Sequence, residues 1–355
     1  MATSYADRWS PEPSGTPERT AGRLSLAGGA LALAVGLAIV ALPGEPSLVA
    51  QAIPLAVSVL LLGLPHGAVD HLVLPRARGE SVDRRALAFV GLLYLVVGGA
   101  YAVVWFLTPA VAFALFILVT LLHWGQGDVY ALDRFLGADH VDDPAGKVAT
   151  LLVRGGAPML VPLVAFPEQY ALVAGWLVGL FDPGAAAALE PAFTPPARAS
   201  VAVGYGLLVA GALVRGYRRA SDRRAWRIDA AEVAALIALF VLVPPILAIG
   251  LYFTLWHSLR HVLRTILVDP VGREALETGQ HGRVLTRFVR DSLPLTVAAL
   301  AIFGGLALLV PRTPAGGTDL LALYLVGIAI VTLPHVVVVT LLDRIEAVWG
   351  PAPNR

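Results

Sequence analysis

Residues 251–267 read LYFTLWHSLRHVLRTIL, and they place His257 and His261 inside a run that is otherwise dominated by large apolar side chains. Four residues are about 40° more than one turn of an α-helix, so both imidazoles leave the same face, one above the other. Two neutral imidazoles at this spacing can bind one metal ion. Burying such a pair in hydrocarbon without a partner is costly, so the stretch indicates a membrane helix that carries a functional site. The alternative is a pair of histidines that hydrogen-bond to neighbouring helices.

The composition is that of an integral membrane protein. Of 355 residues, 57% are hydrophobic and 14% are charged, whereas soluble domains are about 25% charged. The apolar runs are close to the ~20 residues that cross a bilayer, which predicts an all-α, polytopic helical bundle. The formal net charge of +1 gives no reason to expect a nucleic-acid partner. The chain has no cysteine, which excludes disulfides, iron–sulfur clusters and thiolate nucleophiles.

The apolar runs predict about ten spanning helices in one domain, residues 21–349. Residues 1–20 are rich in Pro, Ser, Thr, Arg and Glu, so we expect a disordered tail there, and residues 350–355 form a second tail. The apolar segment from Gln169 to Phe181 is too short to span, which favours a re-entrant or interfacial piece. The spans are expected at 22–42, 48–74, 86–107, 110–130, 148–165, 198–214, 229–243, 246–268, 291–310 and 319–342.

Basic residues indicate how the chain crosses the membrane. The loop at 215–227 is the densest in arginine, whereas the connections at 43–47 and 108–109 carry no positive charge. Because positive charge collects on the cytoplasmic side, both termini are expected in the cytoplasm, in the cell membrane of the host. The second, fourth, eighth and tenth spans then all run inward. They carry, at similar depth in their inner halves, His66, His123, His257, His261 and His335.

The motif LPHGAVDH at 64–71 offers His66 as a ligand, because Pro65 breaks the helical ladder and lets the next side chain turn inward. Asp70 lies four residues later on the same face, as expected of a carboxylate that orients an imidazole. His71 is about 140° around a helix from His66, so both cannot easily face one site. We place Asp70 and His71 around the site rather than in it. The alternative is a charge pair at a helix end.

Three further motifs contain histidine. In HWGQGD at 123–128, an aromatic belt at the membrane interface would explain Trp124 and Asp128 but not His123. Pro334 precedes His335, for which three roles stay open: a ligand, a partner of a ligand, or a wall of the substrate pocket. His140 and His281 lie in polar loops, where we expect solvated side chains.

The set of motifs resembles the Brp/Blh family of bacterial and archaeal membrane proteins, which are β-carotene 15,15′-dioxygenases that make retinal for microbial rhodopsins. The resemblance runs from the second span to the last and is specific as a set. It is carried by PHGAVDH at 65–71, HWGQGD at 123–128, WHSLRH at 256–261 and PH at 334–335.

The resemblance implies Fe(2+) as cofactor, with His66, His123, His257 and His261 as its ligands. It implies that O2 cleaves the central double bond of β-carotene to give two molecules of retinal, for which a microbial rhodopsin is a candidate acceptor. Neutral imidazoles suit iron and leave positions open for dioxygen. Because the polyene dissolves in the lipid bilayer, we expect it to enter between helices. The expected walls of that pocket are Trp124, Tyr252, Phe253, Trp256 and His335.

Three other functions are weighed against this one. A desaturase or hydroxylase with histidine boxes needs more clustered histidines than this chain has, since only His257 and His261 form such a box. An intramembrane metal or proton transporter would spread its histidines along a path through the membrane, which the expected common depth disfavours. A haem carrier would need histidine pairs on facing helices.

Overall fold

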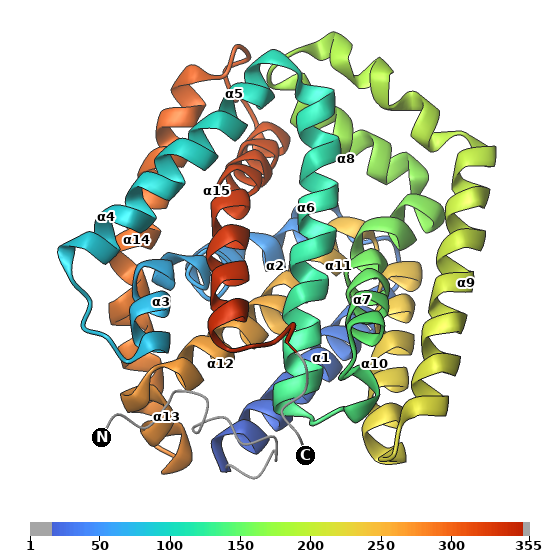
Figure 1. Ribbon diagram of the computed structural model, residues 1–355. Coiled ribbons are helices and arrows are strands. Elements are labelled where there is room, and N and C mark those ends of the chain that lie inside the picture. The colour runs from blue at the N-terminus through green and yellow to red at the C-terminus, as the bar shows by residue number, and fades with distance from the viewer. Residues whose placement is uncertain (1–15, 351–355) are drawn as a thin grey trace.

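The computed structural model describes residues 16–350, and all regular structure in that range is helical. The predicted all-α membrane bundle is therefore confirmed. Figure 1 shows the arrangement, in which the label of each helix follows chain order. The helices are α1 (Thr16–Val40), α2 (Leu48–Leu60), α3 (Asp70–Arg78), α4 (Arg84–Leu93), α5 (Gly99–Leu107), α6 (Pro109–Tyr130), α7 (Pro144–Ala165), α8 (Pro167–Gly179), α9 (Pro195–Arg219), α10 (Arg223–Leu242), α11 (Pro245–Tyr252), α12 (Leu259–Val268), α13 (Pro270–Glu277), α14 (His281–Leu309) and α15 (Gly317–Ile345).

Eight helical segments in the described range are long and apolar enough to cross a membrane. Two of the ten expected spans, 48–74 and 229–243, are not among them. Residues 229–243 belong to α10, whose first half carries charged side chains. The expected short segment after Gln169 is the 13-residue helix α8, followed by a 3-10 segment at Pro183–Phe193. The eight are Pro17–Val40, Arg84–Leu107, Pro109–Phe135, Pro144–Ala165, Pro195–Arg219, Pro245–Val268, His281–Leu309 and Gly317–Ile345.

The expected span over 48–74 is not one continuous helix, because the helix breaks between α2 and α3, around the Pro65 at which a break was expected. The amides of Gly63 and Leu64 both donate to the carbonyl of Ser58, which ends the regular ladder of α2. Pro65 follows and has no amide hydrogen to continue a helix. A side chain at Gly63 would lie 2.7 Å from the ring of Phe253, in the π-helical segment that follows α11, so only glycine lets this turn approach that segment so closely. The break carries His66 into the interior.

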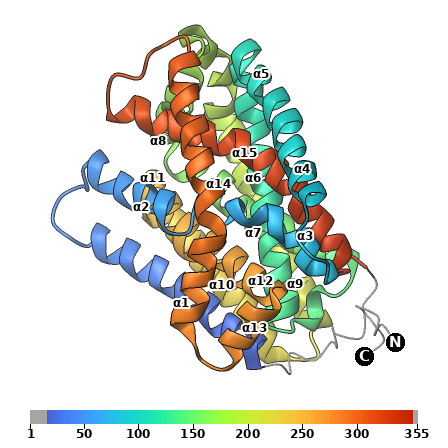
Figure 2. The same ribbon diagram turned by 90° about the vertical axis from the view of Figure 1, so that its left-hand side faces the viewer.

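The helix made of α11, a π-helical segment at Phe253–Ser258 and α12 is the centre of the bundle. This composite helix covers Pro245–Val268, and 83% of the residues in its most apolar stretch are buried. In the most apolar stretch of α9, no residue is buried. Figure 1 accordingly shows α9 on the periphery, and Figure 2 shows α1 and α2 as a tilted pair on another side. Helices α6 and α7 pack closely against each other through Gly125 and Gly155, where an added Cβ would collide with the backbone of the opposite helix.

Helix α1 begins at Thr16, so the expected disordered tail is wrong for residues 16–20. The rest of that tail, 1–15, lies outside the described residues, as do 351–355. Glu18 forms an ion pair with Arg273 of α13, and Arg134 donates to the carbonyl of Glu346 just after α15. The first turns of α1 and the end of α15 therefore lie at the same end of the bundle, the lower end in Figure 1.

Candidate metal centre and apolar pocket

Five imidazole rings meet in the interior of the bundle. They come from four separate parts of the chain, and each side chain is at most 7% exposed. The structure thus brings together the four histidines expected as ligands and adds a fifth. The five are His66 in the break after α2, His123 on α6, His257 in the π-helical segment, His261 on α12 and His335 on α15.

The rings form a compact cluster. His66, His257, His123 and His335 make a closed circuit in which neighbouring ring centroids are 4.8–5.3 Å apart. His261 contacts all four, at 4.6–5.7 Å. Ligand nitrogens of His66, His123 and His335 lie within 4.8 Å of one another, as do those of His123, His257 and His261. Each of these groups of three could hold one ion, and His123 belongs to both.

Local backbone features make room for this cluster. His257 lies in the π-helical segment, where the helix widens, as helices often do at functional sites. On α6, a Cβ at Gly127 would lie 2.6 Å from Nε2 of His261. Glycine at position 127 is therefore required if that nitrogen is to point into the cluster. Gly67 similarly faces the ring of His335, with 3.4 Å between an added Cβ and Nδ1.

The imidazole nitrogens fit a metal ion. Nε2 of His123, His257, His261 and His335 is buried and has no hydrogen-bond partner among the described residues. An unsatisfied buried polar atom costs about 1–3 kcal/mol, so several at one point would be strongly unfavourable unless a ligand paired them. Nitrogen donors without carboxylates suit iron, copper or zinc better than magnesium or calcium. The donor set therefore fits a divalent transition metal, including ferrous iron.

The rings of His335 and His66 are each oriented by a hydrogen-bond partner at Nδ1. Nδ1 of His335 lies 2.9 Å from a carboxylate oxygen of Asp70, which also accepts a 2.7 Å hydrogen bond from the hydroxyl of Tyr94. Nδ1 of His66 contacts the carbonyl of Gly63. With a proton on Nδ1, each ring presents the lone pair of Nε2. Asp70 therefore orients an imidazole as expected, although that imidazole is His335 rather than His66.

His71 is not one of the rings that meet. It is half-buried on α3, and its Nδ1 has no hydrogen-bond partner among the described residues. Residues five apart on a helix are rotated by about 140° about its axis, which explains why the side chain of His71 does not join that of His66.

A buried ionic network lies beside the cluster. The carboxylate of Asp128 forms ion pairs with the guanidinium groups of Arg154 and Arg260, at N–O distances of 3.1 Å and 2.6 Å. Glu232 forms ion pairs with the same two arginines. The expectation that Asp128 lies near the headgroups was wrong, since its side chain is 2% exposed. His140 was expected in solvent but is buried against Asp229 at 2.8 Å. The partners come from distant helices, so the local sequence could not reveal them.

A second network lies at the inner end of α15. Arg264 pairs with Asp343 at 2.7 Å and with Glu346 at 2.5 Å. Arg264 is buried, with only 2% of its surface exposed. Burial raises the pKa of Glu346, and Arg264 opposes that rise. Charged groups therefore fill the space on the inner side of the histidines.

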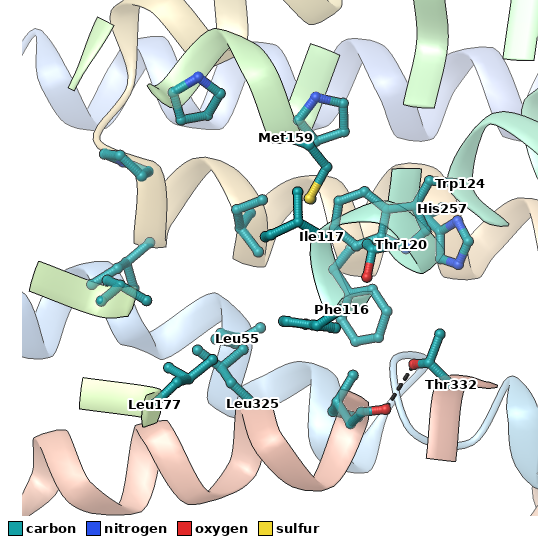
Figure 3. A pocket seen from close by; sticks show the side chains of 18 of the residues that line it. Leu55, Phe116, Ile117, Thr120, Trp124, Met159, Leu177, His257, Leu325 and Thr332 are labelled. Atoms are coloured by element: carbon teal, nitrogen blue, oxygen red, sulfur yellow. Dashed lines mark hydrogen bonds between the residues drawn. The ribbon is translucent and has the colours of Figure 1, made fainter. Parts of the chain in front are cut away.

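An apolar pocket leads to the cluster from the other side. Its walls come from α2, α6, α7, α8, α11 and α15, and His66, His123 and His257 form part of its lining. Figure 3 shows Trp124, Phe116 and His257 close together at this end. Because the lining is mostly apolar, the pocket fits an apolar ligand.

The predicted walls of the pocket were partly correct. Trp124 and Phe253 line it, whereas Tyr252, Trp256 and His335 do not. The pocket face of the central helix carries Ile249, Phe253 and His257, so Tyr252 and Trp256 face away. Trp256 instead donates to Asp128 at 3.3 Å, and His335 is held by Asp70.

The wall that α15 contributes to the pocket was not predicted from the sequence. Leu321, Leu325, Ile328 and Thr332 face the pocket. Nearly every residue of this helix is apolar, so hydrophobic periodicity gives no sign of which face lines a cavity.

Comparison with known proteins agrees with these features. A family model described as beta-carotene 15,15′-dioxygenase matches residues 57–343, which include all five histidines. The probable beta-carotene 15,15′-dioxygenase Blh of Halobacterium salinarum is 44% identical over 338 residues, covering 94% of this chain and 97% of the relative. The probable beta-carotene 15,15′-dioxygenase Brp of the same species is 34% identical over 355 residues, covering 96% of each chain. A beta-carotene 15,15′-dioxygenase of an uncultured marine bacterium is 23% identical over 286 residues, covering 81% and 92%. No solved structure matches.

Proposed function

The chain belongs to the beta-carotene 15,15′-dioxygenase family, and from that premise we propose that it cleaves the central double bond of β-carotene inside the membrane, using a histidine-bound ferrous ion. The products are two molecules of retinal. The observation that carries the proposal is the meeting of four unpartnered Nε2 atoms at one end of an apolar pocket. A metal and a polyene are the two ligands that these surfaces fit.

We assign the ion to His66, His123, His257 and His261, with His335 as a fifth nitrogen ligand. Asp70 and the Gly63 carbonyl keep two of these rings in the tautomer that a metal requires. Nitrogens from four parts of the chain define the position of the ion closely. The same crowding argues against the transporter alternative, since five rings at one point form no path across the membrane.

The reaction needs little from the protein except placement. The two carbons of the double bond each gain one oxygen atom of O2, the bond between them breaks, and two aldehydes form. The alkene itself supplies the electrons that reduce O2, so no outside reductant or proton is needed. When bound, ferrous iron supplies the activation of dioxygen that an alkene alone lacks. The pocket offers few polar groups, and the Thr332 hydroxyl is already bonded to the carbonyl of Ile328 at 2.7 Å (Figure 3). Apart from the three histidines assigned to the ion, Tyr170 and Tyr324, the described residues that line the pocket carry no acidic or basic side chain.

The pocket serves the substrate in two ways. Its apolar walls favour transfer of a polyene from the lipid, and they keep bulk water away from the oxygen chemistry. Trp124 stacks near Phe253 with ring centroids 6.1 Å apart, which gives a flat surface against which a conjugated chain can lie.

We further propose that the protein lies in the cell membrane with both termini in the cytoplasm. The arginine-rich loop at 215–227 and the shared location of the α1 start and the α15 end support that orientation. A microbial rhodopsin in the same bilayer would be a suitable acceptor for retinal.

The test is expression in a bacterium that accumulates β-carotene. We expect the orange colour to fade and retinal to form, with one atom of labelled dioxygen in each aldehyde. Purified protein should contain iron. His257→Ala should abolish both retinal formation and iron binding. His281→Ala, at an exposed site, should change neither retinal formation nor iron content. Intact β-carotene in cells with well-expressed wild-type protein would contradict the proposal.

A further inference from the structure

The pocket has a definite length along the helices that form it. On α6 it runs from Phe113 to His123, ten residues further on, which is about 15 Å at 1.5 Å per residue. On α15 it runs from Leu321 to Thr332, about 16 Å by the same count. Two independent helices thus give nearly the same length from the outer end to the histidines.

Aromatic rings lie at one end of the pocket, and buried charges lie beyond the other. At the outer end, the rings of Phe113 and Tyr170 lie 6.5 Å apart, and Phe193 packs behind Tyr170 at 6.0 Å. Beyond the histidines at the inner end lie the buried ion pairs of Arg260 and Arg264. An apolar chain cannot pass through such ion pairs without separating charges in a low-dielectric interior.

The length matches one half of the substrate. From the central double bond of β-carotene to the far edge of its ring there are about twelve bonds, or ~14 Å at the ~1.2 Å per bond of an extended chain. The whole molecule is twice as long and does not fit. We infer that the pocket is a ruler for one retinal-length half: the ring seats near Phe113 and Tyr170, the central double bond lies at the histidines, and the other half extends sideways between helices into the lipid. This inference rests on the proposed function.

The ruler sets which bond is cut. The position is counted from the ring that occupies the outer end of the pocket, and it does not depend on the length of the half outside. If the pocket is shortened, a bond closer to the seated ring reaches the histidines. Each cut carbon still gains one oxygen atom of O2, so one product becomes shorter than retinal and the other longer.

The first test uses the wild-type protein. Apocarotenals with one intact ring half and a truncated opposite end are supplied to the iron-loaded enzyme, and the products are separated by chromatography. We expect retinal from each of them, with a second dialdehyde whose length varies with the truncation. A cut that moves with the truncated end would overturn the inference. Absence of retinal from β-carotene itself would instead refute the proposed function.

The second test changes the length of the pocket. Leu321→Trp fills its outer end, and Leu320→Trp is the matched control because Leu320 is 59% exposed on the outer surface of the same helix. We expect Leu321→Trp to shift cleavage to one shorter and one longer product. It should also weaken binding of retinal to the metal-free protein by about tenfold or more. Leu320→Trp should leave both the cleavage products and the affinity for retinal unchanged. Unchanged products or unchanged retinal affinity in folded Leu321→Trp would overturn the inference.

Discussion

Asp70 and His335 are 265 residues apart in the chain, yet Nδ1 of His335 lies 2.9 Å from the Asp70 carboxylate. The contact joins the start of α3, just after the helix break, to the middle of α15. It fixes both the orientation and the tautomer of a ring that contacts three other imidazoles, those of His66, His123 and His261. The carboxylate therefore orients one of the rings that we assign to the proposed metal site.

We predict that Asp70→Asn lowers the affinity for Fe(2+) by about 10–100-fold, because the amide no longer secures the proton on Nδ1 of His335. Tyr94→Phe removes only the 2.7 Å hydrogen bond to Asp70 and should have a smaller effect. Affinity is measured by competition with a chelator on purified protein. Glu45→Gln, on an exposed loop, is the control. Equal affinities for Asp70→Asn and the control would show that Asp70 has no such role.

Gly127→Ala should remove the metal while leaving the fold intact. The new methyl group would lie 2.6 Å from Nε2 of His261, which must then turn away from the other rings. The matched control is Gly304→Ala on α14, where nothing lies within 4 Å of an added Cβ. That control should be more stable than wild type by about 0.5–1 kcal/mol, since alanine is favoured in helices. Iron content and circular dichroism distinguish the outcomes, and a fully loaded Gly127→Ala protein would contradict the prediction.

Sequence patterns predicted the helical class and the group of histidines because both follow from local chemistry. Apolar runs of bilayer length indicate spans, and histidines at one depth within them indicate a shared site. The break around Pro65 was foreseen only as a local turn, since its size depends on Gly63 meeting Phe253 from a distant helix. The wrong pocket assignments of Tyr252 and Trp256 have a similar cause. Which face of a uniformly apolar helix meets a cavity depends on its neighbours, and the π-helical segment alters the angular position of later residues.

The buried ion pairs were the largest omission. Asp128, Arg154 and Glu232 come from three different helices, and no local pattern pairs them. In such networks the loss of one partner leaves the others unpaired in a low dielectric, which costs more than the pair contributed.

Arg260→Met should therefore destabilise the protein by about 3–5 kcal/mol, because Asp128 and Glu232 lose a buried partner. The control is Arg290→Met, whose side chain is 71% exposed and should matter by less than about 0.5 kcal/mol. The free energy of unfolding is measured by titrating the detergent-solubilised protein with denaturant. A similar small change for both variants would show that the Arg260 network contributes little to stability.

Removal of iron should lower the melting temperature of the wild-type protein. Without an ion, the Nε2 atoms of His123, His257, His261 and His335 stay buried and unpaired, which favours local opening of the cluster. A ligand that binds only the folded state stabilises it by about 2.7 kcal/mol at one hundred times its dissociation constant. Treatment with a chelator should therefore reduce the melting temperature, and addition of Fe(2+) should restore it. In His257→Ala, neither treatment should shift the transition. If the stripped and loaded wild-type proteins unfold at the same temperature while the iron content differs, then the ion is not bound by these buried rings.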